Sequence, residues 1–213
     1  IRKNNGRFSA DYVIASPPTE WGYGWNYSGI FQRITENEAF VVEDIISDIT
    51  GGKRTIYASN LLTPQDLGKL IIEEQYNYTS LETDDQVLAL YNTEKCVDLK
   101  KSLDALFIAL KDNSTDVENI RGEGEINQAD ALFYFDSSSS DEWIDYCYFD
   151  IYDICTKIIL SNNFSQYIMN IAAEVQEKTN EVILYSFSGR YFQRFQNNIN
   201  GLSFFLPDGD ALY

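Results

Sequence analysis

Short apolar runs alternate along this chain with segments of helical periodicity, and this alternation most limits the folds it can adopt. The run at 11–15 is rich in β-branched residues and is followed by Ser16 and two prolines, which predicts a buried strand that ends in a loop. Further strand-like runs lie at 86–91, 182–187 and 202–206. Helical spacing of apolar residues is found at 41–49, 67–71, 97–112, 151–159 and 164–175. The sequence therefore predicts an α/β core element followed by a helix-rich region.

Two of the expected helices carry boundary signals. A pair of glycines follows the first of them, at 41–49, in the position of a helix stop. The second begins at Thr63, which is a good N-cap, with Pro64 at the first helical position and Asp66 three residues after the cap. The core face expected for this second helix is Leu67, Leu70 and Ile71.

Length and charge narrow the classes of protein. The 213 residues suit one domain, or one domain with a smaller companion, and a hydrophobic content of 44% supports a buried core. The net charge of −17 argues against binding to nucleic acid and to anionic membrane surfaces, and it favours cationic partners. No apolar run approaches the roughly 20 residues that span a bilayer, so no membrane span is expected.

The chain has no histidine, and this restricts the chemistry that it can perform alone. Ser-His-Asp and Cys-His catalysis and His-ligated zinc are excluded within these 213 residues. An enzyme of this kind would rely on carboxylates, or part of its machinery would lie outside this chain. Three cysteines cannot form a full disulfide set and show no CxxC spacing, so we expect buried structural thiols at Cys96, Cys147 and Cys155.

Metal and cofactor signals are weak. Four acids, at Asp136, Asp141, Glu142 and Asp145, could bind Ca²⁺ through oxygen ligands, but they lack EF-hand spacing and a solvated acidic face is expected instead. Two glycines at 22 and 24 lack the rest of a dinucleotide fingerprint, and we expect no cofactor. The sequence leaves open a glycosidase-type pair of catalytic carboxylates, although no spacing singles out such a pair.

A dense aromatic cluster follows the first predicted strand. Its members are Trp21, Tyr23, Trp25 and Tyr27, with Gly22 and Gly24 between them. Large aromatic side chains in a loop at a strand end are typical of binding sites in open α/β folds. The cluster is either a platform for stacking a sugar or a lid packed onto the core, and composition favours the packed lid.

The same region carries a family resemblance. The segments Ala10–Ser16, Thr19-Glu20 and Gly22-x-Gly24-Trp25-Asn26-Tyr27 resemble a segment of the clostripain family of cysteine peptidases. Similar segments then follow in the family's order at 66–69, 87–91, 97–106, 149–153 and 200–207. The chain departs from the family pattern at Pro17 and Pro18, which replace two acids, at Trp21, which replaces Pro, and at Asn26, which replaces Asp.

The resemblance implies a fold and an activity. The fold would be part of a caspase-like αβα sandwich with a helix-rich C-terminal region. Residues 1–62 would form the C-terminal part of the peptidase core with its substrate-pocket loop, and residues 63–213 a helical region with short strands. The activity would be hydrolysis of peptide bonds after Arg or Lys by a Cys/His dyad. Neither dyad residue can be matched here, so both are expected upstream of Ile1, and this chain alone is expected to be inactive.

The resemblance also implies site residues and partners. Ser16, Thr19 and Glu20 would lie near the substrate pocket, with Trp25 bracing it, and Glu20 would attract a cationic side chain. In the plainer alternative, Glu20 and Trp25 only shape the loop. Expected partners are peptide or protein substrates with Arg or Lys before the scissile bond, and the N-terminal chain of the same precursor.

Family traits add further expectations. Members are commonly self-cleaved into two associated chains, are secreted or exposed at the bacterial surface or in the periplasm, and some respond to calcium. A catalytically inactive homologue that acts as a binding or scaffold module is the alternative function.

Overall fold

A three-stranded sheet forms the centre of the chain. The computed structural model describes residues 10–17, 25–36, 41–47, 53–58, 63–77, 86–112, 132, 134, 148–189 and 194–205. The central strands are β1 (Tyr12–Ala15), β4 (Val87–Asn92) and β6 (Ile183–Ser188), in the order β1-β4-β6, and both neighbouring pairs are antiparallel. All three were expected from their short apolar runs. The middle strand β4 is buried from its first residue to its fifth, because helices cover both of its faces.

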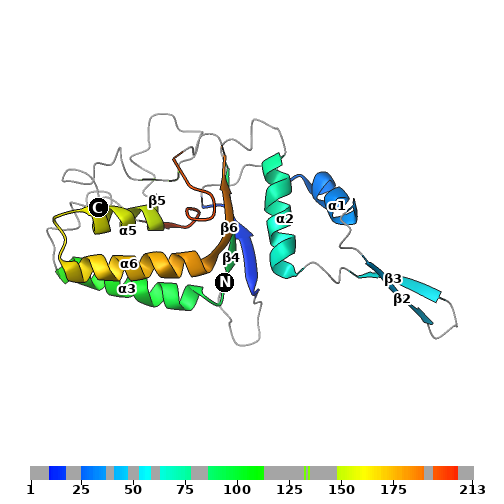
Figure 1. Ribbon diagram of the computed structural model, residues 1–213, viewed down its shortest axis with the longest axis horizontal. Helices are drawn as coiled ribbons and strands as arrows, with labels where there is room; N and C mark the ends of the chain where they lie inside the picture. Colours follow the sequence, from blue (N-terminus) through cyan, green and yellow to red (C-terminus); the bar gives the residue numbers. More distant parts are fainter. Residues whose placement is uncertain are drawn as a thin grey trace, which may run out of the picture.

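Helical layers lie on the two sides of this sheet (Figure 1). On one side is α2 (Pro64–Asn77), with α1 (Tyr27–Glu36) beyond it, and on the other are α3 (Cys96–Asp112), α5 (Ile151–Leu160) and α6 (Gln166–Val182). Alternate residues of a strand point to opposite faces of a sheet. Leu88 and Leu90 accordingly pack with Ile72 of α2, while Ala89 and Tyr91 belong to the core on the side of α3, α5 and α6. The result is a mixed helix-and-sheet arrangement compatible with the expected α/β class, and its caspase-like form remains a prediction.

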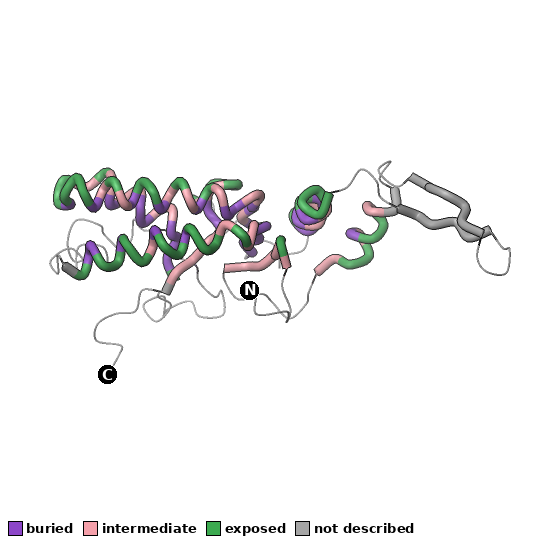
Figure 2. Tube along the Cα trace, turned by 90° about the horizontal axis from the view of Figure 1, so that it is seen from below, coloured by how far each residue is buried: buried purple, intermediate pink, exposed green. Residues whose placement is uncertain are grey.

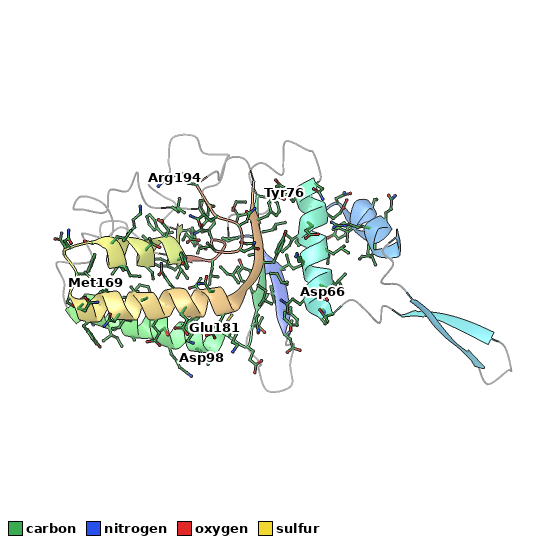
Figure 3. All side chains as sticks on the ribbon, in the orientation of Figure 1. Asp66, Tyr76, Asp98, Met169, Glu181 and Arg194 are labelled. Atoms are coloured by element: carbon green, nitrogen blue, oxygen red, sulfur yellow. The ribbon has the colours of Figure 1, made fainter. Side chains whose placement is uncertain are left out.

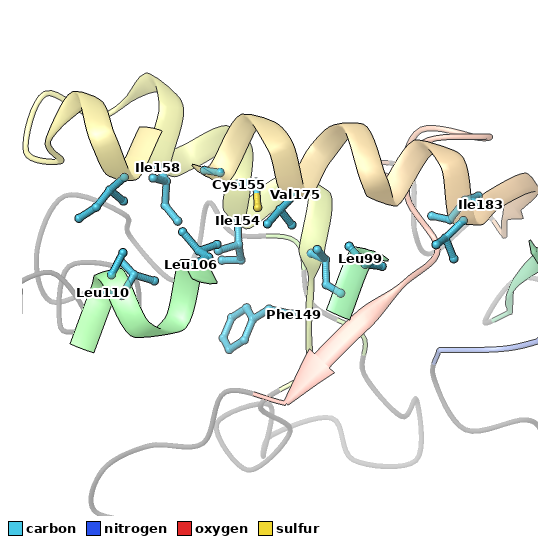
Figure 4. Packing of buried hydrophobic residues seen from close by; sticks show 14 of the residues in the cluster. Leu99, Leu106, Leu110, Phe149, Ile154, Cys155, Ile158, Val175 and Ile183 are labelled. Atoms are coloured by element: carbon cyan, nitrogen blue, oxygen red, sulfur yellow. The ribbon is translucent and has the colours of Figure 1, made fainter. Parts of the chain in front are cut away.

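The larger core lies between the three helices and the sheet. Helices α3, α5 and α6 contribute residues at helical spacing to it, as predicted (Figure 4). These include Leu99, Leu106, Leu110, Ile154, Cys155, Ile158, Ile168 and Val175. Figure 2 shows that the buried residues of these helices alternate with exposed ones along each tube. A short antiparallel sheet of β5 (Tyr148–Asp150) and β7 (Ser203–Phe205) adds Phe149 to this core.

Helix α2 begins as its sequence predicts. The Thr63 hydroxyl accepts a hydrogen bond from the Asp66 amide at 3.1 Å, and the Asp66 carboxylate accepts one from the Thr63 amide at 3.2 Å. This reciprocal capping box satisfies donors that a helix start otherwise leaves unpaired. Of the predicted core face, Leu70 is buried, whereas Leu67 and Ile71 are half-buried. Gly68 lies directly against the sheet, since a Cβ there would lie 2.6 Å from Leu90 Cδ1.

The predicted helix at 41–49 is wrong. Residues Val41–Ser47 form β2, which pairs antiparallel with β3 (Lys53–Ala58). The register of the pair shifts between Glu43 and Ile45, which inserts a residue into the period-2 pattern. An inserted residue converts alternating apolar positions into pairs spaced like a helix, and the β-branched residues of this segment favour a strand. The glycine pair that resembled a helix stop stands between two strands of a hairpin.

The cysteines fit their prediction only in part. Cys155 is buried, as predicted, whereas Cys96 is exposed, and Cys147 lies outside the described residues. Cys96 is the first residue of α3, directly after the turn at 93–95. It therefore precedes the residues of this helix that face the core, although the helical pattern predicted its burial.

Two further predictions concern membrane spans and the domain boundary. Within the described ranges, every helix is too short or too polar to cross a membrane. The proposed boundary between residues 62 and 63 remains a prediction, and one sheet contains β1 from before it and β4 and β6 from after it.

Candidate functional site: a strand-end loop and its anchors

The candidate site is the segment that leaves the sheet after β1. Ala15, the last residue of β1, pairs with Ala89 of β4, and Ser16 follows it directly. Ser16 is half-buried, and its Oγ is buried without a hydrogen-bond partner in the described structure. A buried hydroxyl without a partner costs about 1–3 kcal/mol, so a hydrogen-bond partner for the Ser16 Oγ would stabilise the fold. Thr19 and Glu20 lie outside the described residues.

A second serine at the same end of the sheet shares this property. Ser188 ends β6 and pairs with Val87 at the start of β4. Because β1 and β6 both run antiparallel to β4, Ser16 and Ser188 lie at the same end of the sheet. The Ser188 Oγ is also buried without a hydrogen-bond partner in the described part of the chain. Sequence patterns gave no signal for Ser188, since a serine at the end of a strand is common.

Trp25 holds the far end of the loop against the core. Its indole is half-buried and packs on the smaller hydrophobic cluster, between α2 and the sheet. That cluster is formed by Ile72, Leu88, Leu90 and Phe187. Of the two cluster members that the structure describes, Trp25 fits the packed-lid interpretation, whereas Tyr27 does not, because it is 61% exposed. The bracing of a substrate pocket by Trp25 stays a prediction.

Asn26 connects this loop to α1 and α2. Its Oδ1 accepts a hydrogen bond from the Gly29 amide at 3.2 Å, which makes Asn26 the N-cap of α1. The backbone amide of Asn26 donates a hydrogen bond to Gln75 Oε1 at 3.0 Å, and its side-chain Nδ2 donates one to Glu74 Oε1 at 3.4 Å. Aspartate also caps helices well, so the departure from Asp to Asn at this position keeps the local structure.

Two buried glutamines continue the connection into the sheet. Gln75 Nε2 donates to Gln86 Oε1 at 3.2 Å, and both side chains are buried at 3% exposure. Gln86 immediately precedes β4, so one chain of hydrogen bonds runs from the loop through α2 to the central strand. Tyr76 and Asp66 mark the two ends of α2 in Figure 3, and these contacts lie at the Tyr76 end.

Helix α1 was missed by sequence reasoning, which extended the loop through Tyr27. An ion pair holds it on α2, because Arg33 Nη2 lies 2.8 Å from Glu73 Oε2 and Arg33 Nη1 lies 3.8 Å from Glu74 Oε2. The signal that could have found α1 was Asn26 itself, as a cap followed by ten residues without proline. The aromatic cluster concealed it, because the cluster dominates the composition of this segment.

Replacing Asn26 tests how firmly the loop is held. Asn26→Ala is expected to lower the free energy of unfolding by about 1–2 kcal/mol, since it removes the cap and the contact with Glu74. Asn26→Asp is expected to recover only the capping part of this loss, because a carboxylate accepts the Gly29 amide equally well but cannot donate to Glu74. Urea unfolding followed by circular dichroism measures both, and equal losses in the two variants would contradict the capping role.

The described cysteines do not offer a nucleophile. Burial raises the pKa of the Cys155 thiol, and partial desolvation by neighbouring atoms raises that of Cys96, although this residue is exposed. A reactive cysteine needs instead a lowered pKa and a nearby base. The chain contains no histidine that could act as that base. That this chain carries no catalytic residue stays a prediction, and the raised pKa values of the two thiols are consistent with it.

Metal ligands are not gathered in the described structure. Within the described ranges, no three His, Cys, Asp or Glu side chains come together as they would around a metal ion. The four acids considered for Ca²⁺, from Asp136 to Asp145, lie outside those ranges, so that possibility is neither supported nor opposed.

Comparison with known proteins identifies the family. The model of the clostripain family, peptidase family C11, matches residues 3–213. Clostripain from Hathewaya histolytica is 40% identical to this chain over 216 aligned residues, which cover 100% of this chain and 40% of clostripain. The chain belongs to the clostripain family of peptidases. It spans less than half the length of this relative.

Proposed function

We propose that this chain is the C-terminal part of a clostripain-like cysteine endopeptidase that cleaves after Arg or Lys. In this proposal the Cys/His dyad lies upstream, and these residues supply the substrate-pocket loop and the structural body behind it. The observation that carries the proposal is the 40% identity to clostripain along the entire chain, together with the absence of any histidine from it. A thiol nucleophile needs a base, so a histidine would have to come from the remainder of the parent protein.

The anchoring of the loop supports its role in binding substrate. One end follows β1, which is fixed in the sheet, and the other is held by Trp25 and Asn26 against α2. A binding loop with two rigid ends positions its side chains without a large loss of entropy on binding. Ser16, Thr19 and Glu20 lie in or beside this segment, and we propose that Glu20 pairs with the cationic side chain of the substrate.

The edges of the sheet support the proposed partner, the N-terminal chain of the same precursor. The outer edge of β6 is closed by side chains, since Asn198 Oδ1 accepts from the Ser186 amide at 3.2 Å and Asn197 Oδ1 accepts from the Ser188 amide at 2.9 Å. In the described structure, the outer edge of β1 pairs with no strand. An open edge is a natural place for strand addition. An apolar cavity of about 440 Å³, between β1 and α2, lies beside it.

The charge of the chain fits the proposed substrate class. At −17, its field would draw in peptides that carry Arg or Lys. A location outside the bacterial cell, as expected from the resemblance, belongs to the same proposal.

The proposal is tested by the substrate preference of the full-length parent protein. Fluorogenic peptides that end in Arg, Lys or Ala before the reporter group should give rapid cleavage of the first two and little of the third. Failure to cleave any of the three would favour the alternative function, an inactive homologue that acts as a binding or scaffold module. Rapid cleavage of the Ala peptide would contradict the proposed specificity.

A substitution tests the role of Glu20. In the parent protein, Glu20→Gln is expected to raise KM for an Arg peptide about ten- to hundredfold with kcat little changed, because a charge-assisted contact is worth about 1.5–3 kcal/mol. Glu94→Gln, at an exposed position in the turn between β4 and α3, is the matched control. An unchanged KM in the Glu20 variant would show that this residue only shapes the loop.

A further inference from the structure

Asn200 and Gly201 form a tightly held peptide unit in the segment that leads into β7. Asn200 is buried, with 3% of its surface exposed. Its Nδ2 donates a hydrogen bond to Asp150 Oδ1 at 2.7 Å, and its Oδ1 accepts one from the Gln196 amide at 2.7 Å. The Gly201 amide donates to the other carboxylate oxygen, Asp150 Oδ2, at 3.2 Å. One carboxylate therefore holds both the side-chain nitrogen and the peptide nitrogen of this Asn-Gly unit.

The fold requires these two residue types. Gly201 has a φ of +137°, which residues with a side chain rarely adopt, and a Cβ there would lie 3.1 Å from Ala89 Cβ and 3.2 Å from Ser186 Cβ. The side chain of Asn200 both donates and accepts a hydrogen bond in a buried place. An ionised aspartate could not donate there, and glutamine would add a methylene to a packed site. The structure therefore depends on an Asn-Gly sequence at this point.

An Asn-Gly sequence is chemically reactive, because glycine leaves its own nitrogen open to the preceding side chain. The Gly201 nitrogen loses its proton and attacks Asn200 Cγ. A new N–Cγ bond forms, the Cγ–Nδ2 bond breaks, and the side-chain nitrogen leaves with a proton as ammonia. Water then opens the cyclic imide at either carbonyl, which gives aspartate or isoaspartate. Water is the only co-reactant, so the reaction needs neither an enzyme nor a redox partner.

The folded structure opposes each step of this reaction. The Gly201 N–H points at a carboxylate, and loss of its proton there would bring two negative charges together. The Gly201 carbonyl accepts a hydrogen bond from Tyr91 Oη, and the Asn200 carbonyl accepts one from Ser186 Oγ at 2.6 Å. The backbone cannot turn toward Asn200 Cγ without breaking these contacts. Burial of Asn200 also keeps out the water that opens the imide.

The product of the reaction would not fit the place that Asn200 occupies. Aspartate has no side-chain N–H to donate to Asp150, which is itself fully buried. Two carboxyl groups in such a place would repel each other or take up a proton, and both cost free energy. Isoaspartate would add a methylene to the backbone next to Gly201, whose neighbours leave no room even for a Cβ.

We propose that Asn200 is a latent deamidation site, which the folded chain protects and which reacts when the segment 196–201 opens. Conversion of Asn200 then keeps this segment from returning to its native contacts. Opening therefore becomes irreversible with time, and the working lifetime of the protein depends on how rarely this segment opens. The inference is independent of the proposed peptidase function, since its chemistry uses Asn200, Gly201 and water.

The first experiment compares folded and urea-unfolded full-length parent protein in the same mildly alkaline buffer. Peptide mapping by mass spectrometry follows deamidation at Asn200 and at Asn5, which precedes the other Asn-Gly sequence of this chain. In urea the two sites should react at similar rates. In the folded protein Asn200 should react at least about a hundredfold more slowly than in urea, because it reacts only through a rare open state. Reaction at Asn200 that is equally fast or faster in the folded protein would overturn the inference.

A variant tests whether the product is incompatible with the fold. Asn200→Asp carries the side chain of the deamidated residue, and it should unfold at a clearly lower urea concentration than the parent protein or fail to fold. Asn162→Asp makes the same chemical change at an exposed position between α5 and α6, and its midpoint should match that of the parent. An Asn200→Asp protein as stable as the parent would overturn the inference, because deamidation would then leave the fold intact.

Discussion

Replacing Asp150 by alanine is expected to lower the free energy of unfolding by about 3 kcal/mol, because the substitution leaves several buried donors without an acceptor. Asp150 is fully buried, and its carboxylate accepts hydrogen bonds from Tyr134 Oη at 2.5 Å and Asn200 Nδ2 at 2.7 Å. It also accepts from the amides of Asp153 at 2.9 Å and Gly201 at 3.2 Å. Burial raises the pKa of this carboxyl, and these hydrogen bonds oppose the rise.

The position of Asp150 explains why the effect should be global. The residue ends β5 and caps α5. Two of its partners, Asn200 and Gly201, belong to the segment that leads into β7. Tyr91 of β4 donates a hydrogen bond to the Gly201 carbonyl, which ties the same segment to the central sheet. The carboxylate therefore joins parts of the chain that lie 50 residues apart in sequence.

Urea unfolding of the variant and of a control measures this prediction. Asp104→Ala is the control, since Asp104 is an exposed residue of α3 whose partner is a surface lysine, and its loss should cost less than about 1 kcal/mol. Similar losses in the two variants would show that the Asp150 contacts contribute little.

Replacing Trp25 by alanine in the parent protein is expected to reduce kcat/KM for an Arg peptide at least tenfold. The indole packs between α2 and the sheet and holds one end of the proposed pocket loop, so its removal releases that end. Lost packing should also lower the free energy of unfolding by about 2–3 kcal/mol, less than for a fully buried tryptophan because Trp25 is half-buried. Peptide hydrolysis measured well below the unfolding transition separates the two effects.

Two further variants make the Trp25 test specific. Trp25→Phe keeps much of the apolar packing and should retain most of the activity. Tyr167→Ala removes an aromatic ring that is 68% exposed on α6, away from the loop, and should change neither activity nor stability appreciably. Full activity in Trp25→Ala would contradict a role for this residue in holding the site.

The elements that sequence reasoning predicted correctly are those in which local and long-range preferences agree. The helix at Pro64–Asn77 has its capping box within four residues. Helices α5 and α6 bury most of the apolar stripe that their periodicity defines, except for Tyr167, which the stripe includes and the structure exposes. Strand β2 was mistaken for part of a helix at 41–49 because a β-bulge imitates helical spacing. Local patterns cannot show such an insertion, since it is defined only by the partner strand.

The candidate site was predictable only in its location. The strand and its end at Ser16 were visible in the sequence, whereas the role of the following aromatic loop stays a prediction. The contacts that fix the loop were not, because Asn26, Gln75 and Gln86 are separated by 49 and 11 residues and carry no shared motif. These 213 residues contain no histidine, so the class of reaction came from family membership.

The most direct test of the central account asks which cysteine the activity requires. The parent protein should lose its cleavage of an Arg peptide on alkylation, with the loss tracking modification of a cysteine outside this chain. A variant with serine at Cys96, Cys147 and Cys155 should remain active and should remain sensitive to the same reagent. Activity that survives complete alkylation, or that disappears in the triple variant while the protein stays folded, would contradict the account.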